Sequence, residues 1–255
     1  MTSQRPGAII VGASSGIGAS LAGELARRGY QLALLARRDA ELEALATRLN
    51  GSGASESPLA RVYPHDVRDY DAAPALFAKI LDDLGGAPLT LLVYVSGALP
   101  AGGPEVWPFE EQREMIETNL LGAMRWLDLG AELFSRQGRG SLVGVSSVAG
   151  DRGRYGNSAY MASKAGLSVY LESLRYRLAR RGVRVVTVKP GFVATRMIAD
   201  KQPPRPLVIS ADAAARQMAE VCERGPEVVY VPARWGWIMR VVRAAPSFVM
   251  KRSKF

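Results

Sequence analysis

The chain has 255 residues, of which 48% are hydrophobic, 22% are charged and 26 are glycine. This length suffices for one well-buried domain, and no change in composition marks a linker. The 33 basic and 24 acidic residues leave a net charge of +9, which suits an anionic partner. No basic platform with interleaved aromatic residues is present, so we expect no nucleic-acid binding. The single cysteine, Cys222, excludes an internal disulfide and favours a cytoplasmic location.

Apolar strand-like segments alternate with amphipathic helical segments along the chain. In chain order, strands are expected at residues 8–13, 30–36, 60–67, 89–97, 140–147, 183–191 and 227–232. Helices are expected at residues 17–29, 39–50, 71–85, 109–134, 158–182 and 211–224. Strands this uniformly apolar are covered on both faces, so the pattern predicts a single-domain α/β fold with a doubly wound, Rossmann-like parallel sheet. Ligands of such sheets bind beyond the carboxyl ends of the strands.

A glycine-rich turn, GASSGIG, follows the first expected strand and opens the first expected helix. Its glycines are Gly12, Gly16 and Gly18. Glycines in this place let the backbone turn tightly and approach a pyrophosphate, whose charge is held by the amides and the positive end of the helix dipole. An ordinary turn is the alternative, but the position directly after a first strand favours phosphate binding.

Two arginines end the second expected strand, where an NAD site usually has an acidic residue that binds the ribose 2′-hydroxyl. The residues here are Ala36, Arg37 and Arg38. Two guanidinium groups suit a 2′-phosphate, and the missing carboxylate removes a repulsive charge, so the segment predicts a preference for NADP(H). The alternative, that exposed arginines merely begin the next helix, is more credible for Arg38 than for Arg37.

The third expected strand ends in PHDV, which contains His65 and Asp66. The carboxylate of Asp66 could accept a hydrogen bond from an adenine amino group, or it could cap the following helix, and the spacing leaves both alternatives open. His65 is the only histidine. With no second histidine and no nucleophile and acid near it, we expect a structural role for His65 and no metal site.

A tyrosine and a lysine one helical turn apart lie at the start of the helix expected at residues 158–182. Tyr160 and Lys164 fall on its apolar stripe. A lysine there is costly unless it has a partner or a chemical task. A nearby cation favours the phenolate, so the pair is typical of an acid/base tyrosine tuned by a lysine. An isolated pair of this kind would more simply be a snorkelling lysine beside a half-buried tyrosine.

Two further polar residues are expected at the same end of the sheet. Ser147 closes the strand expected at residues 140–147, where its hydroxyl could bind a substrate carbonyl. Asn119 lies on the apolar face of its own helix, so its amide must be satisfied internally or through water. Four polar residues at one end of one sheet indicate a functional site.

In these motifs the sequence resembles the short-chain dehydrogenase/reductase family in its single-domain form, over roughly residues 7–231. The motifs GASSGIG, DV, TNLLGA, VSSVAG, YMASK and PGFVAT occur in the order and spacing of that family. The resemblance implies a catalytic tetrad of Asn119, Ser147, Tyr160 and Lys164. Tyr160 would then transfer the proton, and Ser147 would orient the carbonyl. Lys164 would lower the tyrosine pKa and bind the nicotinamide ribose, and Asn119 would anchor a water relay.

The resemblance also implies the contacts with NADP(H). Besides Asn119, Tyr160 and Lys164, the expected cofactor contacts are Gly12, Ser14, Ser15, Gly16, Ile17, Gly18, Arg37, Arg38, Asp66, Val67, Gly97, Pro190, Gly191, Val193 and Thr195. The last four match the family segment that cradles the nicotinamide. Members commonly pair through two long helices, here about residues 110–136 and 158–181, so a homodimer or homotetramer is expected.

One motif departs from the family pattern. The usual Asn-Asn-Ala-Gly after the fourth strand is YVSG here, from Tyr94 to Gly97, and only the last glycine is kept. The asparagine contacts that stabilise the sheet edge and the cofactor cavity are therefore lost. The tetrad is unaffected, so catalysis is still expected.

A basic amphipathic tail, residues 234–255, follows an expected catalytic domain at residues 1–233. Polar and cationic residues recur at helical spacing, namely Arg240, Arg243, Ser247, Lys251 and Lys254. They oppose an apolar set of Trp237, Ile238, Met239, Val241, Val242, Phe248 and Val249. Such a helix could lie on an anionic membrane surface, or it could pack over the substrate cleft or at a subunit interface, and both alternatives stay open. Pro246 would break or kink it.

Two other segments bear on the substrate. SSVAGDRGRYGNSAY and LLVYVSGAL are similar to a branch of the family that includes reductases of polyprenyl-phosphate-linked keto-pentoses. The proline-rich loop at residues 198–210 lies where a substrate lid would close.

We therefore expect an NADP(H)-dependent oxidoreductase of the carbonyl reductase type. It would transfer hydride between nicotinamide and a carbonyl or secondary alcohol, which is either a small molecule or lipid-linked. The expected location is the cytoplasm, at the inner face of the membrane if the tail binds lipid. The alternative is a nucleotide-binding regulatory or scaffold protein that keeps the fold without turnover.

Overall fold

The protein is built around one parallel sheet of seven strands, in the order β3-β2-β1-β4-β5-β6-β9. The computed structural model describes residues 5–51, 58–100, 108–200 and 203–252. The strands of the sheet are β1 (Gly7–Val11), β2 (Gln31–Ala36), β3 (Ala60–Pro64), β4 (Leu89–Tyr94), β5 (Gly140–Val145), β6 (Val183–Pro190) and β9 (Val228–Val231). The expected doubly wound α/β fold is confirmed.

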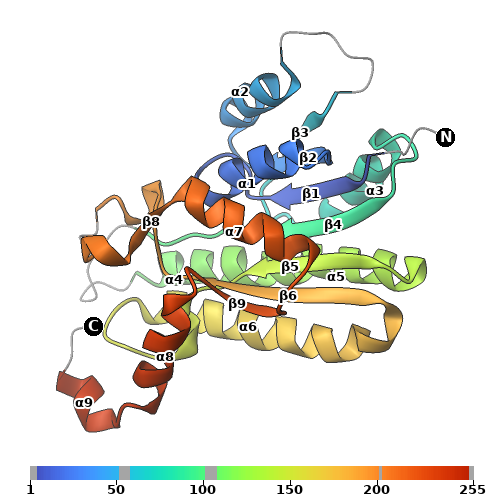
Figure 1. The fold of residues 1–255 in the computed structure, drawn as a ribbon. Coiled ribbons are helices and arrows are strands. Elements are labelled where there is room, and N and C mark those ends of the chain that lie inside the picture. Colours follow the sequence, from blue (N-terminus) through green and yellow to red (C-terminus); the bar gives the residue numbers. More distant parts are fainter. Residues whose placement is uncertain (1–4, 52–57, 101–107, 201–202, 253–255) are drawn as a thin grey trace.

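Helices cover both faces of this sheet (Figure 1). On one face lie α1 (Gly16–Arg27), α2 (Asp39–Asn50) and α7 (Ala211–Glu223), and on the other α3 (Ala73–Asp83), α5 (Gly122–Gln137) and α6 (Ser158–Leu178). Successive strand residues point to opposite faces, so in β1 Ala8 and Ile10 pack toward α1 while Ile9 and Val11 pack toward α5 and α6. Both sets are buried, which is why the strands read as continuous apolar runs.

The strand order reverses beside β1, which is paired with β2 on one side and with β4 on the other. Val11 at the end of β1 lies level with Leu35 of β2 and with Tyr94 of β4. This register brings three segments to one edge of the sheet: the glycine turn, the Arg37–Arg38 pair and the YVSG segment. Loops that diverge from such a reversal leave a crevice for a ligand.

The helix expected at residues 109–134 is interrupted. It consists of α4 (Phe109–Ile116), a π-helical turn (Glu117–Leu121) and then α5. Asn119 lies in the π turn. A π turn inserts an extra residue into a helix and frequently marks a functional site.

The loop that follows β6 is held by a small second sheet. β7 (Phe192–Ala194) pairs in parallel with β8 (Val208–Ser210), and two short 3-10 turns, Arg196–Ile198 and Arg205–Leu207, lie between them. Residues 201–202 of this loop lie outside the described chain. The segment 192–198 therefore has a fixed place at the sheet edge, close to where the lid was expected.

The C-terminal tail forms two helices, α8 (Arg234–Ala244) and α9 (Ser247–Arg252), with Pro246 between them as expected (Figure 1). Trp235 and Met239 are fully buried against Val148. The single apolar face expected for the tail is therefore wrong, because Met239 packs inward while Trp237 stays exposed.

The inner face of α8 is tied to the body of the protein. The guanidinium of Arg152 donates to carbonyl groups in the last turn of α8 and just beyond it, those of Val242, Arg243 and Ala245. A cation at a helix C-terminus also interacts favourably with the helix dipole. The outer face exposes Trp237, Val241, Phe248 and Val249, and Lys254 lies outside the described residues. In the described segments, no helix has the length and apolar character needed to span a membrane.

Candidate active site

A cavity of about 460 Å³ opens at the carboxyl edge of the sheet. It brings together most residues that the sequence singled out: Gly12, Ser14, Ser15, Gly16, Ile17, Gly18, Arg37, Arg38, Val67, Gly97, Ser147, Tyr160, Lys164, Pro190, Gly191, Val193 and Thr195. Two predicted residues, Asp66 and Asn119, do not contribute to its wall as the structure describes it.

The glycine turn fits a close approach of backbone and ligand. Gly12 has a φ of 103° and Gly16 a φ of 56°, both in the left-handed region that favours glycine. A Cβ on Gly12 would lie 2.5 Å from the amide nitrogen of Ser96, so a larger residue would displace that segment. Helix α1 begins at Gly16, and no side chain caps its N-terminus. The amides and dipole of α1 are thus directed at the cavity, as a pyrophosphate site requires.

Arg38 joins the glycine turn to the end of β2. Its Nη2 donates to the hydroxyl oxygens of Ser14 and Ser15, each at 2.7 Å, and its Nη1 donates to Glu41 at 3.2 Å. Arg38 is also the N-cap residue of α2, so the helix-start interpretation is correct for its backbone. Its side chain nevertheless lies at the phosphate-binding turn.

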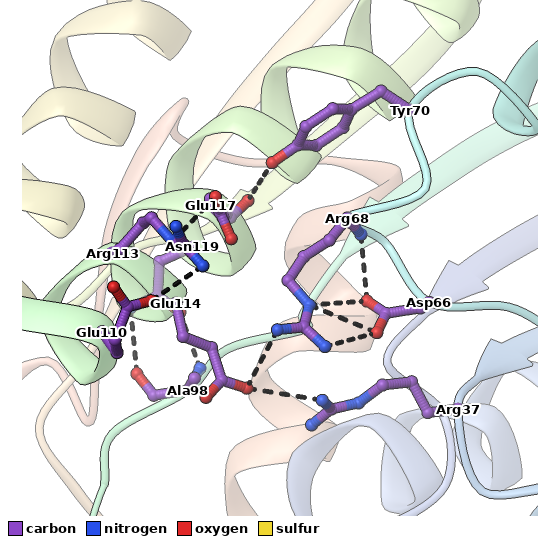
Figure 2. Close-up of polar contacts among 10 residues, drawn as sticks. All are labelled: Arg37, Asp66, Arg68, Tyr70, Ala98, Glu110, Arg113, Glu114, Glu117 and Asn119. Atoms are coloured by element: carbon purple, nitrogen blue, oxygen red, sulfur yellow. Dashed lines mark hydrogen bonds and ion pairs between the residues drawn. The ribbon is translucent and has the colours of Figure 1, made fainter.

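Arg37 lies nearer the surface and is paired across the crevice. Its Nη1 is 3.4 Å from the carboxylate of Glu114 on α4, which is also 3.7 Å from Nη1 of Arg68 (Figure 2). Both Arg37 and Arg38 line the cavity. The Arg37 side chain stays 54% exposed despite its ion pair, and a contact of either arginine with a 2′-phosphate stays a prediction.

Asp66 has a different partner from those expected. Its carboxylate accepts from the Arg68 backbone amide at 3.0 Å and from the Arg68 guanidinium at 2.7 Å (Figure 2). These bonds lower the pKa of Asp66. Helix α3 begins at Ala73 with Ala72 as its N-cap, so of the two alternatives the one in which Asp66 caps this helix is wrong. A contact between Asp66 and adenine stays a prediction.

His65, which lines the cavity, packs edge-on against the ring of Trp126 with centroids 5.3 Å apart. Burial lowers its pKa. The neutral form therefore dominates near neutral pH, which agrees with a packing role.

Tyr160 and Lys164 occupy the first turns of α6. The side chain of Asn157 accepts from the Tyr160 amide at 2.9 Å and so begins the helix. Lys164 is 4% exposed, and its Nζ donates to the carbonyl of Val145 at 2.9 Å, at the end of β5. This Nζ lies 5.9 Å from the centroid of the Tyr160 ring. Burial lowers the pKa of Lys164 from 10.5 to about 8.

The side chains of Tyr160 and Ser147 both line the cavity. Burial raises the pKa of Tyr160, and the Ser147 side chain opposes this by lowering it. Ser147 itself caps a short 3-10 turn, where its Oγ accepts from the Ala149 amide at 3.1 Å. A lowering of the tyrosine pKa by Lys164 stays a prediction.

Asn119 is satisfied internally, one of its two expected alternatives. Its Oδ1 accepts from the Ala98 amide at 2.7 Å, and its Nδ2 donates to the Ala98 carbonyl at 3.0 Å (Figure 2). The same Nδ2 donates to Ser163 Oγ at 3.0 Å. Ser163 in turn donates to the carbonyl of Tyr160 at 2.7 Å. The amide therefore ties the segment after β4 to α6. A water relay anchored by Asn119 stays a prediction.

The sequence analysis did not identify several residues that line the cavity. Ser96 and Thr118 line the wall between the glycine turn and the tetrad, and Arg154 lines the cavity before α6. Trp235 reaches the cavity from α8 and packs on Gly191, where an added Cβ would overlap the indole ring. No local pattern links Trp235 to Gly191, because they lie far apart in the chain.

Comparisons with known proteins agree with this arrangement. Residues 7–206 match the protein family described as short chain dehydrogenase. An uncharacterized oxidoreductase of Myxococcus xanthus is 35% identical over 240 residues, which cover 94% of this chain and 92% of that protein. A 3-oxoacyl-(acyl-carrier-protein) reductase of Bos taurus is 34% identical over 192 residues, which cover 75% of this chain and 77% of that protein.

Solved structures are similar over nearly the whole chain. A variant of the actinorhodin polyketide ketoreductase with NADPH is 26% identical, with a TM-score of 0.78 over 91% of this chain and 97% of that one. A short chain dehydrogenase from Burkholderia cenocepacia in complex with NADP is 23% identical, with a TM-score of 0.80 over 99% and 98% of the two chains. The second likeness concerns the fold alone.

Proposed function

The chain belongs to the short-chain dehydrogenase family and is an oxidoreductase, and from that premise we propose that it is an NADP(H)-dependent carbonyl reductase. The observation that carries the proposal is that Ser147, Tyr160 and the buried Lys164 line one cavity, with the ammonium of Lys164 5.9 Å from the centroid of the Tyr160 ring. These three groups lie on the wall of the cavity that also contains the glycine turn. The cavity thus joins an acid/base pair to a phosphate-binding end.

The residues at the phosphate-binding end suit NADP(H). Gly12 and Gly18 let the turn pack closely, since a Cβ on Gly12 would meet the Ser96 backbone and one on Gly18 the Gly12 carbonyl, and the N-terminus of α1 follows without a side-chain cap. Arg38 already binds two hydroxyls at this turn, and Arg37 lies beside it. The polyketide ketoreductase with NADPH, 26% identical to this chain, supports the same cofactor.

At the other end, the tetrad supplies the proton chemistry. NADPH, when bound, supplies a hydride to the carbonyl carbon. Tyr160 gives its proton to the carbonyl oxygen, and its raised pKa keeps it protonated near neutral pH. Ser147 donates a hydrogen bond to the same oxygen and so orients it. The charge on Lys164 stabilises the phenolate that remains on Tyr160.

A turnover assay tests the proposal. Purified protein is offered NADPH with a panel of soluble ketones and with a detergent-solubilised membrane lipid extract, and the absorbance of NADPH is followed. We expect turnover with at least one ketone, and no turnover for Tyr160→Phe, which should bind NADPH as tightly as the wild type. NADPH binding without turnover on any carbonyl would instead support the nucleotide-binding scaffold.

For the tail, we propose that the outer face of α8 and α9 contacts an anionic membrane surface. Trp237, Val241 and Phe248 are 71%, 72% and 63% exposed, which is unusual for large apolar side chains. The guanidinium of Arg240 stacks 4.5 Å from the ring centroid of Trp237, and no acidic residue occurs from 233 to 252. An exposed aromatic face among cations suits anionic lipid, and it disfavours twofold pairing of this face with itself.

Sedimentation with lipid vesicles tests this contact, and the lipid-extract arm of the turnover assay tests a lipid-linked substrate. The wild type should sediment with vesicles that contain phosphatidylglycerol and not with pure phosphatidylcholine. The double variant Trp237→Ser/Phe248→Ser should stay in the supernatant, while Val228→Ser, which removes an exposed apolar side chain elsewhere, should behave as the wild type. Sedimentation of the double variant equal to that of the wild type would contradict the membrane contact.

A further inference from the structure

The departure from the family pattern at YVSG creates a hydrogen-bonded link that the sequence did not reveal. Tyr94 ends β4 and is fully buried. Its hydroxyl donates to the backbone carbonyl of Thr118 at 2.5 Å. The first residue of the altered motif therefore binds the turn that precedes α5.

The partner of Tyr94 is the π-helical turn between α4 and α5. Thr118 belongs to this turn, and Gly122 follows it directly. A Cβ on Gly122 would lie 2.7 Å from the Tyr94 hydroxyl oxygen, so the glycine admits the phenol. An extra residue in a helix leaves backbone groups without regular helical partners, and a buried carbonyl needs one. The phenol supplies it.

The same turn carries Asn119, the next residue after Thr118. Asn119 holds both backbone groups of Ala98, four residues after Tyr94 in the chain. The segment from Tyr94 to Ala98 is thus fastened to the π turn at both ends. Between these points lies Gly97, where a Cβ would be 3.3 Å from Asn119 Oδ1 and 3.5 Å from Lys164 Nζ. A shift of the turn would therefore change the positions of Asn119 and of the Gly97 segment beside Lys164.

We propose that Tyr94 is a positioning residue that stands in the place of the first missing asparagine. The phenol fixes the π turn, the turn holds the side-chain amide of Asn119 in place, and Asn119 acts through Ser163 on the backbone of Tyr160. Tyr94 exchanges no proton with the substrate. The kinetic part of this inference rests on the proposed carbonyl reductase function.

The variant Tyr94→Phe tests the role, because it keeps the ring and removes the hydroxyl. We expect kcat to fall roughly tenfold, as for the loss of one buried hydrogen bond, while KM and Kd for NADPH change less than about twofold. Hydrogen exchange of the amides at residues 118–122 should become faster. The matched control is Tyr63→Phe, because Tyr63 is also buried and its hydroxyl donates to Asp83 at 2.9 Å, outside the cavity.

The control should lose thermal stability without any loss of kcat or faster exchange in the π turn. If Tyr94→Phe does not fold, Gly122→Ala provides the test with the same expected pattern, because the added Cβ would lie 2.7 Å from the Tyr94 hydroxyl oxygen and displace the phenol. Unchanged kcat and unchanged exchange would overturn the proposal, as would an equal loss in Tyr63→Phe. If the wild type reduces no ketone, the exchange measurement still decides the positioning role, so the two failures are distinguishable.

Discussion

At the residue scale, Lys164 is the most informative side chain of the site. It is buried at 4% exposure, and among the described residues its ammonium donates to the Val145 carbonyl. Burial disfavours the charged form, which is why its pKa falls to about 8. Tyr160, whose pKa is raised, is the titratable group that faces it. The proton donor and the cation therefore lose their protons in different pH ranges.

The pH dependence of activity follows from this order. Ketone reduction needs a protonated Tyr160 and a charged Lys164, and Lys164 loses its charge first as pH rises. We expect kcat/KM for NADPH to fall as pH rises through about 8, because this quantity reports the free enzyme. Initial rates between pH 6 and pH 10 would show it. A flat profile across this range would contradict the assignment of Lys164.

The cofactor preference is a second prediction at this scale. Arg37→Asp places a carboxylate where a 2′-phosphate is expected to bind, so the affinity for NADPH should fall at least about tenfold while that for NADH changes much less. Fluorescence titration measures both. Arg27→Asp makes the same charge change on an exposed arginine outside the cavity and should leave both affinities intact. Equal losses for the two cofactors in Arg37→Asp would refute the phosphate role.

At the scale of elements, α8 is a wall of the active site. Trp235 is fully buried, packs edge-on against Phe192 of β7 and contacts Gly191 after β6. Arg152 binds the other end of the same helix. The neighbouring Asp151 forms an ion pair with the ammonium of Lys189 at 2.5 Å, and its carboxylate accepts from the Tyr230 hydroxyl at 2.7 Å. The helix is thus joined to the loops on both sides of the tetrad, while the domain boundary at residue 233 stays a prediction.

A methyl group at Gly191 tests this packing. Gly191→Ala would overlap the indole of Trp235, and overpacking of this kind costs about 1–3 kcal/mol. We expect Tm to fall by roughly 2–10 °C. Gly153→Ala is the control, since an added Cβ there meets nothing within 4 Å. The double variant Gly191→Ala/Trp235→Ala should be less destabilised than the sum of its parts, and strict additivity would exclude direct contact.

At the scale of the whole molecule, two groups of strongly exposed apolar side chains stand out among the described residues. One is the outer face of the tail. The other lies on α4 and α6, where Phe109, Val169 and Tyr176 are 72%, 65% and 70% exposed. Val169 and Tyr176 are seven residues apart and share one face of α6. These are the long helices through which the family resemblance predicts subunit pairing.

A charge on α6 should therefore change the oligomeric state. We expect the wild type to be a homodimer or homotetramer, and Val169→Arg to dissociate it into smaller species in light scattering after size exclusion. Val241→Arg places the same charge on an equally exposed valine of α8 and should leave the assembly intact. If Val241→Arg dissociates the protein instead, the tail is the subunit interface and the membrane contact loses its support.

Much of this arrangement was readable from local patterns. Alternating apolar strands and amphipathic helices predicted the parallel sheet, because a strand that is buried on both faces has apolar residues at nearly every position. The sequence also placed Tyr160 and Lys164 one turn apart on one helix face, and both line the cavity. The partner of Asp66 could not be predicted in this way. The N-cap alternative relied on spacing alone, whereas the Asp66 carboxylate accepts from the guanidinium of Arg68.

The sequence by itself thus determined the fold class, the glycine turn and the placing of Tyr160 and Lys164 on one helix face, since each depends on periodicity or on spacing within one element, while the tetrad as a whole is what the family resemblance implies. Only the tertiary structure decided which groups from distant segments meet. It placed Trp235 on Gly191, Arg152 on the end of α8 and the Tyr94 hydroxyl on the π turn. Such contacts depend on side-chain direction and on the packing of separate elements, and neither is encoded in a local pattern.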